Sequence, residues 1–223
     1  MRALRNHSLA LFFLVIFVAA LVGQAFAGQD GFNHAQVAHH GEPVTLWRYV
    51  TSSSYWTDVL ENWQSEYLQF TLYILVTVWL VQKGSPESKQ LDEVGTQSDQ
   101  DQLVGAHAGE DSPRWARVGG LRTRIYSNSL VMVMLTIWVL SWLGQAVAGR
   151  VDYNAEQIDH QLAPVSLTRY VTTSDFWDRT LQNWQSEFLA VGSMAVLAIY
   201  LRQRGSPESK PVGTPHHVTG VEG

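Results

Sequence analysis

Long apolar blocks alternate with strongly polar segments along the chain. Two blocks of about 19 residues carry no charged side chain, enough for an α-helix to cross ~30 Å of hydrocarbon at 1.5 Å per residue. Two further blocks, of about 15 and 14 residues, are too short unless the polar turn before each one is included in the helix. The pattern predicts an all-α membrane protein with four transmembrane helices, at about residues 9–27, 63–82, 130–148 and 184–203.

The first apolar block also has the three regions of a signal peptide. Arg2 and Arg5 precede it, and Ala25–Phe26–Ala27 ends it before Gly28. The same element recurs in mid-chain at Leu130–Ala148, where it cannot be a signal sequence. We therefore favour a retained span over a cleaved one.

An internal repeat organises most of the chain. Residues 8–89 align without a gap to residues 129–210, with about 37 identities in about 82 positions. The identities include GQAFAG with GQAVAG, RYVTSSSYW with RYVTTSDFW, LENWQSEYL with LQNWQSEFL, and QKGSPESK with QRGSPESK. The chain is therefore predicted to be a tandem repeat of a two-helix unit.

Lysine and arginine positions predict how the spans are oriented. About eleven cations lie near the two termini and the middle connection, whereas about four lie in the two long loops. Positive charge favours the cytoplasmic side, so we expect both termini and the middle connection inside the cell and the two loops outside. The halves are then parallel repeats, related by a pseudo-two-fold axis along the membrane normal.

The composition divides the chain into four segments. The predicted units are a first repeat at 1–91, an acidic disordered linker at 92–122, a second repeat at 123–211 and a disordered tail at 212–223. The linker is rich in Gln, Asp, Ser and Gly, a composition that does not bury enough apolar surface to fold. A mean hydropathy of −0.06 therefore averages four apolar spans with these polar segments.

Charge and composition exclude several classes of function. Charged residues make up 16% of the 223 residues, against about 25% in ordinary soluble domains. There is no cysteine, which excludes disulfides, thiolate zinc sites and iron–sulfur clusters. A net charge of −5 argues against nucleic acid as a partner. The chain has no phosphate-binding loop and no hydrolase or zinc-protease motif, so we expect no cofactor and no metal.

Short helices are predicted to cap the outer face. Asn33–Gln36 and Asn154–Gln157 have capping-box-like spacing, so a new helix is expected to begin at each. Thr45 and Ser166 are expected to cap one turn further along the chain. The helix that continues into the second span of each repeat should then be capped by Ser53 or Ser54 in the first repeat, and by Ser174 or Asp175 in the second.

That last helix carries an aromatic stripe in each repeat. Tryptophans recur at positions i and i+7 with leucine between them, typical of one helical face. Tryptophan is enriched at membrane–water interfaces. The predicted interface aromatics are Trp56, Trp63, Trp177 and Trp184.

Glu66 and Glu187 fall about one helical turn inside the outer boundary of the predicted spans. A charged group at that depth is costly and marks a candidate functional site. Three interpretations stay open: a structural ion pair, a carboxylate that extends to the headgroups, or a role with a ligand, proton or ion. Arg48 and Arg169 are the expected partners. The rest of the predicted polar cluster comprises Asn62, Asn183, Tyr49, Tyr170, His39 and His160.

The paired NWQSEYL/NWQSEFL and GSPESK runs resemble a family of uncharacterised bacterial multi-pass membrane proteins. Members of that family have an NWxSEF-type run before an apolar span and a GSxESK run after it. The resemblance covers nearly the whole chain apart from the linker and tail, and it implies a bacterial membrane protein. It transfers no catalytic residue. From the residues themselves, GSPESK is a helix stop, with headgroup contact as the alternative.

Two hypotheses of function follow. The first is a non-enzymatic binding, permeation or scaffolding role in the cell membrane, with the lipid bilayer as partner and homo-oligomerisation left open. The alternative is a membrane enzyme on a lipid or envelope substrate, with Glu66 or Glu187 as general acid–base. Both repeats keep the same polar residues, which favours the first.

Overall fold

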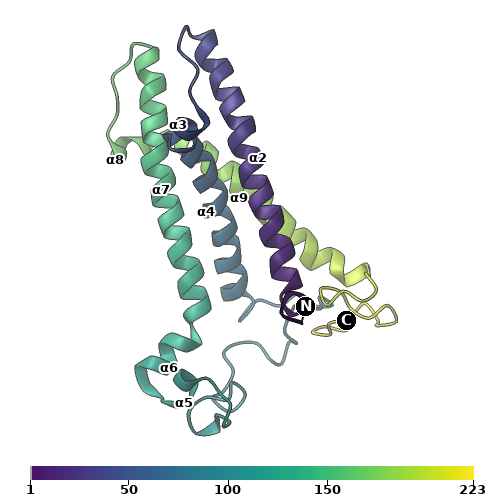
Figure 1. Ribbon diagram of the computed structural model, residues 1–223. Coiled ribbons are helices and arrows are strands. Elements are labelled where there is room, and N and C mark those ends of the chain that lie inside the picture. Colours follow the sequence, from purple (N-terminus) through teal and green to yellow (C-terminus); the bar gives the residue numbers. More distant parts are fainter. Residues whose placement is uncertain (1) are drawn as a thin grey trace. The chain divides into compact units, whose positions relative to one another are not determined.

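The computed structural model describes residues 2–223, and every regular element in that range is helical. The helices are α1 (Arg2–Asn6), α2 (Ser8–Ala38), α3 (Leu46–Val50), α4 (Ser53–Val76), the 3-10 helix η1 (Gly105–His107), α5 (Arg114–Arg117), α6 (Gly120–Ser127), α7 (Ser129–Asp159), α8 (Leu167–Tyr170) and α9 (Ser174–Tyr200) (Figure 1).

The chain divides into two compact units. The first, here called the loop unit, contains Met1–Leu60 and Gly144–Thr173 and thus both long loops. The second, called the tail unit, contains Glu61–Leu143 and Ser174–Gly223 and thus the linker and the C-terminal tail. Helices α4 and α7 each contribute to both units.

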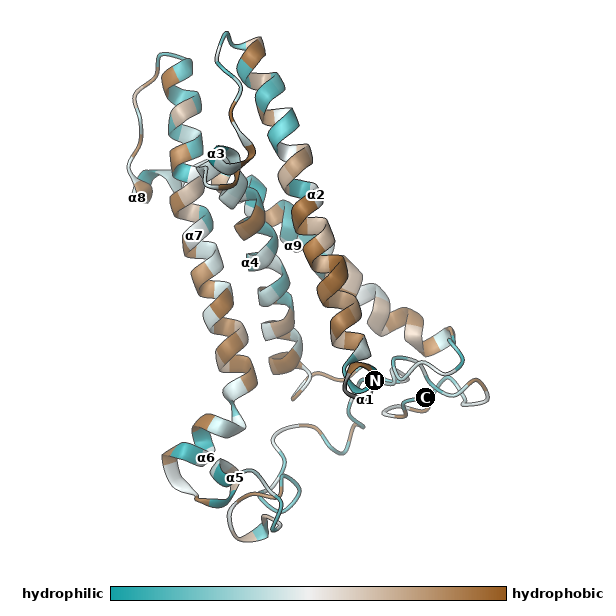
Figure 2. Ribbon diagram, in the orientation of Figure 1, coloured by the Kyte–Doolittle hydropathy of each residue, from teal (hydrophilic) through white to brown (hydrophobic). Residues whose placement is uncertain are grey.

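Two helices, α2 and α7, are long and apolar enough to cross a membrane. Each has 31 residues, so both run past the predicted span ends at 27 and 148. Figure 2 shows the change of character along α2, whose hydrophobic residues give way to hydrophilic ones towards its C-terminal end. Two residues after the end of each helix, the backbone turns through a left-handed residue, His40 after α2 and Gln161 after α7, each with a φ of 61°.

The predicted new helices at Asn33 and Asn154 are wrong, because α2 and α7 continue through both residues. Each asparagine instead fixes the loop that follows its helix. Asn33 Nδ2 donates to the Val44 carbonyl at 3.1 Å, and its Oδ1 accepts from the Val44 N–H at 2.7 Å. Asn154 makes the same two bonds to Val165, at 3.0 and 2.8 Å. The side chain pairs with the loop backbone as a neighbouring strand would.

The short helices α3 and α8 begin where the sequence predicts. The Thr45 hydroxyl accepts from the Arg48 N–H, and the Ser166 hydroxyl accepts from the Arg169 N–H. The cap of α4 lies one residue before the predicted pair, since the Ser52 hydroxyl accepts from the Tyr55 N–H at 3.3 Å. A side-chain oxygen at this position satisfies one of the free N–H groups of the first turn.

Among the described helices, α4 and α9 are not both long enough and apolar enough to count as candidate membrane spans, as α2 and α7 are. The helical part of the predicted span 63–82 stops at Val76, and the chain then turns through Thr77–Trp79. The helix of span 184–203 stops at Tyr200. Two candidate spans are therefore established by length and composition, and crossing by α4 and α9 stays a prediction.

Burial is inverted relative to a water-soluble bundle. Gln64 and Gln145 are 0% exposed, whereas Leu9, Val15 and Leu189 are 67–72% exposed. The buried polar residues on α4, α7 and α9 are Thr57, Gln64, Ser65, Thr71, Ser141, Gln145 and Thr180. Soluble proteins rarely leave so many large apolar side chains exposed, whereas membrane bundles place small and polar residues between helices.

The linker and the tail were predicted to be unstructured, and the structure gives both defined contacts. The linker contains η1, α5 and the start of α6. Thr123 Oγ1 donates to the Trp115 carbonyl at 2.6 Å, which joins α6 to α5. The tail forms turns, the Thr219 hydroxyl accepts from the Gly84 N–H at 2.8 Å, and the Gly220 N–H donates to the Ser85 carbonyl at 3.1 Å.

Candidate functional site

Two adjoining pockets lie among the loops of the loop unit. The larger has a volume of about 370 Å³ and draws on both repeats, since residues at the end of α2, the start of α4 and the end of α7 line it. The second, of about 350 Å³, shares Phe32, Gln36 and Ser52 with the first and extends over Arg48. We call the two together the loop crevice.

Negative charge dominates the larger pocket. Asp152, Glu156 and Asp159 line it from α7 at positions i, i+4 and i+7, so they share one helical face. His39 and His160, at the ends of α2 and α7, line it as well. Because helix C-termini carry partial negative charge, two such ends add to the attraction for a cation.

The smaller pocket combines opposite charges with a buried phenol. Glu42 and Arg48 line it beside Tyr49, which is only 3% exposed. Burial, and then the negative charges of Asp58 and Asp152, raise the pKa of Tyr49 above its ordinary value. The phenol is therefore neutral at physiological pH.

A glycine makes room for each buried tyrosine. A Cβ at Gly28 would overlap the Tyr49 hydroxyl, and one at Gly149 would overlap the Tyr170 hydroxyl. The rings pack on Phe32 and Tyr153 at centroid separations of 5.6 and 5.4 Å. These close approaches explain why the tyrosine of the RYV run follows the glycine by 21 residues in both repeats.

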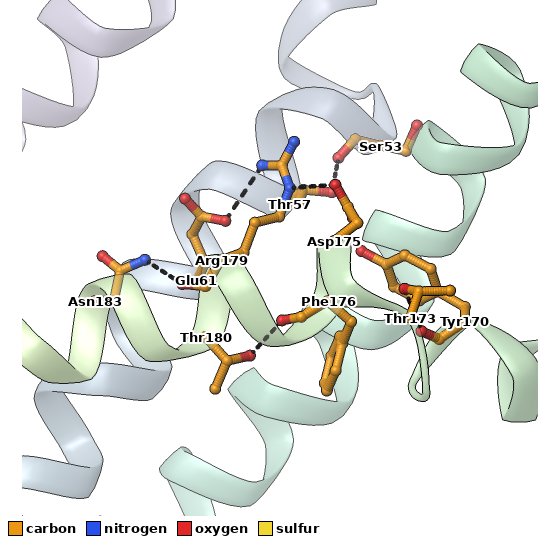
Figure 3. A network of polar contacts seen from close by, with 10 residues as sticks. All are labelled: Ser53, Thr57, Glu61, Tyr170, Thr173, Asp175, Phe176, Arg179, Thr180 and Asn183. Carbon is orange, nitrogen blue, oxygen red and sulfur yellow. Dashed lines mark hydrogen bonds and ion pairs between the residues drawn. The ribbon is translucent and has the colours of Figure 1, made fainter.

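A polar network joins α4 and α9 in the tail unit (Figure 3). Arg179 Nη1 lies 3.4 Å from a Glu61 carboxylate oxygen, and its Nε lies 3.5 Å from Asp175. Asn183 Nδ2 donates to the Arg179 carbonyl at 2.9 Å. Glu61 is 17% exposed, so this ion pair is partly shielded from solvent.

The predicted glutamates, Glu66 of α4 and Glu187 of α9, both belong to the tail unit. Glu66 is exposed and Glu187 half-buried. Between the same two helices, Trp184 Nε1 donates to Gln64 Oε1 at 2.8 Å. The helices that carry the two glutamates are thus joined by a hydrogen bond between Gln64 and Trp184, which the sequence did not predict.

The predicted polar cluster is divided between the units. Those in the loop unit are Arg48, Arg169, Tyr49, Tyr170, His39 and His160, and those in the tail unit are Glu66, Glu187, Asn62 and Asn183. The proposed pairing of each arginine with a glutamate therefore stays a prediction. Arg48 and Arg169 are exposed, whereas both tyrosines are buried.

The predicted interface tryptophans are partly accessible. Trp56 and Trp177 are 42% and 39% exposed, and Trp63 and Trp184 are half-buried. In the tail unit, Trp142 lies at the centre of an aromatic group that sequence analysis did not predict, with ring centroids 5.7–6.4 Å away. Its neighbours are Trp138, Phe176, Trp177 and Trp184.

Sequence analysis missed the three acids of the loop crevice. Their i, i+4, i+7 spacing is visible at Asp152, Glu156 and Asp159. It was not recognised because a helix end was expected near 148 and a new helix at Asn154. Recognising that α7 continues to Asp159 places all three on one face.

The carboxylates, imidazoles and serine hydroxyls that line the loop crevice can bind a ligand by charge and by hydrogen bonds. Over residues 2–223, no group of three or more His, Asp or Glu side chains has the geometry to hold a metal ion. The acids are instead spread over two helical turns of α7. This spacing suits an extended or bulky cation.

Comparison with known proteins gives a family and no activity. The family model described as Domain of unknown function (DUF6766) matches residues 1–221, which includes the linker and nearly all of the tail. No curated protein and no solved structure matches the chain.

Proposed function

The chain belongs to this family of unknown function, and from its structure we propose a four-span membrane protein that binds a small organic cation at its outer face without catalysis. The four spans come from the parallel two-helix repeat, with α2 and α4 in one half and α7 and α9 in the other. Both termini and the linker lie in the cytoplasm of a bacterial cell, and both long loops lie outside.

The membrane location rests on the inverted burial. Large apolar side chains cover the surfaces of α2 and α7, and amides and hydroxyls lie buried between helices. In lipid, the apolar surface is already solvated, so helices associate through small and polar residues. Water would instead drive that apolar surface into contact with itself.

Crossing by α4 and α9 is supported by their lengths and by their polar contacts. With 24 and 27 residues they extend ~36 and ~40 Å, more than the ~30 Å of hydrocarbon. Near the outer end, Arg179 lies within 3.5 Å of carboxylate oxygens of both Glu61 and Asp175, so it offsets one of these two negative charges. A paired charge near a helix end is far less costly in lipid than an isolated one.

The binding role rests on one observation, the acidic loop crevice built from both repeats. Three carboxylates and two helix C-termini favour positive charge. A cavity of about 370 Å³ is much larger than a metal ion requires and lies within the range of small-molecule sites. The lipid bilayer is the other partner that this proposal requires.

Calorimetric titration of the purified protein with spermidine at constant ionic strength tests the binding role. The variant Glu156→Gln/Asp159→Asn should weaken binding by about tenfold, since each partly exposed charge pair contributes up to ~1 kcal/mol. Asp178→Asn, an exposed acid on α9 in the tail unit, is the matched control and should leave binding unchanged. Equal affinity in all three proteins would contradict the proposal.

The enzymatic alternative is supported by the bond between Gln64 of α4 and Trp184 of α9, the helices that carry Glu66 and Glu187. Enzymes commonly use a pair of carboxyl groups as proton donor and acceptor. If Glu66→Gln and Glu187→Gln each abolish a cellular phenotype while the protein still inserts and binds spermidine, this alternative gains support over simple binding.

A further inference from the structure

The two lysines of the GSPESK runs have different surroundings in the tail unit. Lys210 is 1% exposed, and its Nζ donates to the carbonyls of Gly84 and His216 at 2.6 and 2.9 Å. Lys89, at the equivalent position, is half-buried, and its Nζ donates to the Gly95 carbonyl at 2.7 Å. An ammonium group has three N–H donors, so Lys89, with this one partner in the part of the chain that the structure describes, keeps two donors for a further acceptor.

Lys89 lines a pocket of about 590 Å³, which is larger than either pocket of the loop crevice. All of its lining residues belong to the tail unit, and most come from the linker and α6. One face of α6 lines it, through residues at positions i, i+3, i+4 and i+7, which are Gly120, Thr123, Arg124 and Ser127. We call this cavity the linker pocket.

Positive charge outweighs negative charge among the residues that line the linker pocket. Within the described residues, Lys89 and Arg124 line it against a single acid, Asp99. Arg124 is exposed, and its guanidinium has no hydrogen bond or ion pair among residues 2–223. A guanidinium presents five N–H donors in a planar fork that matches phosphate and carboxylate oxygens. The pocket therefore offers free cationic donors to an anion.

Hydroxyl groups and open backbone form much of the remaining wall. Thr96 and Ser127 line the pocket with hydroxyls, which can donate to an anionic oxygen. Glycines line it as well, and nothing lies within 4 Å of a Cβ placed at Gly95, Gly105 or Gly119. The backbone beside these glycines is therefore accessible to a ligand.

The linker pocket lies next to the end of a candidate membrane span. Asn128, which lines it, directly precedes Ser129, the first residue of α7. Helix α7 is long and apolar enough to cross a membrane. Cationic residues that flank a span lie at the level of the lipid headgroups and attract anionic lipids. A lipid phosphate is therefore within reach of this pocket.

We propose that the linker pocket binds a phosphate group, with Lys89 and Arg124 as its charged contacts. Phosphate oxygens accept hydrogen bonds from an ammonium group and bidentate ones from a guanidinium. The volume exceeds what a phosphate alone requires, so the rest of a headgroup fits beside it. Because of the position next to α7, a lipid headgroup is the expected source of the phosphate, and a soluble phosphate ester is the other source. The site shares no residue with the loop crevice and has the opposite charge preference.

Calorimetric titration of the purified chain in a neutral detergent tests the site with three probes at constant ionic strength. Dioctanoyl phosphatidylglycerol carries both acyl chains and phosphate, glycerol phosphate carries phosphate without chains, and dioctanoylglycerol carries chains without phosphate. The first should bind saturably and the last should not bind. Glycerol phosphate should bind more weakly than the lipid if the source is a headgroup, and as tightly as the lipid if the source is a soluble ester.

Arg124→Gln should weaken binding of phosphatidylglycerol by about fivefold, the effect expected of one partly exposed charge pair, and Lys89→Gln/Arg124→Gln should weaken it further. Arg122→Gln is the matched control, because Arg122 is also exposed on α6, lies about 200° around the helix and does not line the pocket. It should leave binding unchanged. Asp99→Asn removes the opposing charge and should strengthen binding by about threefold.

Thermal unfolding of each variant in the same detergent shows that it is folded, and Arg124→Gln is expected to match the unmodified chain because its side chain bonds to no described residue. Three results would each overturn the proposal. Neither phosphate probe binds; dioctanoylglycerol binds as tightly as phosphatidylglycerol; or Arg122→Gln and Arg124→Gln weaken binding equally, which would mean that general electrostatic attraction holds the lipid.

Discussion

At several positions where their sequences agree the two repeats make the same contacts, and where their charges diverge they make different ones. Asn33 and Asn154 each hold a loop valine by two hydrogen bonds, and Ser88 and Ser209 each accept from the N–H six residues earlier at 2.9 Å. Identity is therefore explained by local geometry that each half must build for itself.

The two repeats differ in a few charged residues, and these differences change which contacts form. When the two repeats are aligned, Ser54, Asp58 and Glu61 of the first correspond to Asp175, Arg179 and Gln182 of the second. These changes produce the Glu61–Arg179–Asp175 network, which two identical halves could not form. Two repeats of similar sequence can thus keep their loop and turn geometry while a few changed charges create a contact that is specific to α4 and α9.

The lysines of the GSPESK runs provide the largest expected difference. Lys210→Met should cost about 3 kcal/mol, because the buried ammonium bonds to several carbonyls that would lose their donor. Lys89 is half-buried, and within the described part of the chain its Nζ bonds to the Gly95 carbonyl alone, so Lys89→Met should cost less than about 1 kcal/mol. Chemical unfolding in detergent measures both, and equal costs would show that the lysines remained equivalent.

Gly28→Ala and Gly149→Ala should both destabilise the protein, by about 2 kcal/mol each, since the new methyl overlaps a buried tyrosine hydroxyl. Gly23→Ala is the control within α2. Nothing lies within 4 Å of a Cβ there, so it should gain up to about 1 kcal/mol from the helix preference of alanine. Thermal unfolding of the three variants suffices, and a neutral Gly28→Ala would refute the close packing of Tyr49.

Asn154→Ala should cost somewhat more than Asn33→Ala, at about 1.5 against 1 kcal/mol. The carbonyl of Val44 has a second donor in Gln29 Nε2, at 2.9 Å. Position 150 in the second repeat, the counterpart of Gln29, is an arginine whose buried Nε has no hydrogen-bond partner among residues 2–223. Hydrogen exchange of the Val44 and Val165 amides gives a second measurement, and the larger loss of protection is expected at Val165.

The smallest effect is expected from the ion network. A double-mutant cycle between Glu61→Gln and Arg179→Ala should give a coupling free energy of about 0.5 kcal/mol, because Arg179 is 36% exposed. No coupling at all would mean that the diverged charges contribute nothing to pairing between α4 and α9 in the tail unit.

Sequence patterns predicted the helical class, the two long apolar helices and the Thr45 and Ser166 caps, because each depends on neighbouring residues. They failed at Asn33 and Asn154, where a capping pattern lies inside a helix and the side chain bonds to a loop 11 residues away. Such a contact is fixed by tertiary structure. The acids of the crevice and the bonds of Lys210 were missed for the same reason, since their partners lie on other elements.

The sequence repeat itself made the equivalent contacts easy to find once one copy was known. It did not reveal which residues of a run bond within their own half and which bond to the other half. Lys89 and Lys210 illustrate this limit, because identical runs of six residues place one lysine on its own linker and the other on Gly84.

Cysteine accessibility across intact membranes tests the four-span arrangement most directly. Single cysteines at His34, Thr96, Ala155 and Gly213 report both loops, the linker and the tail in a chain with no competing thiol. Positions 34 and 155 should react with a membrane-impermeant maleimide from outside, and positions 96 and 213 only after the membrane is opened. If position 96 reacts from the same side as position 34, α4 does not cross, and a protein with only α2 and α7 in the membrane replaces the four-span account.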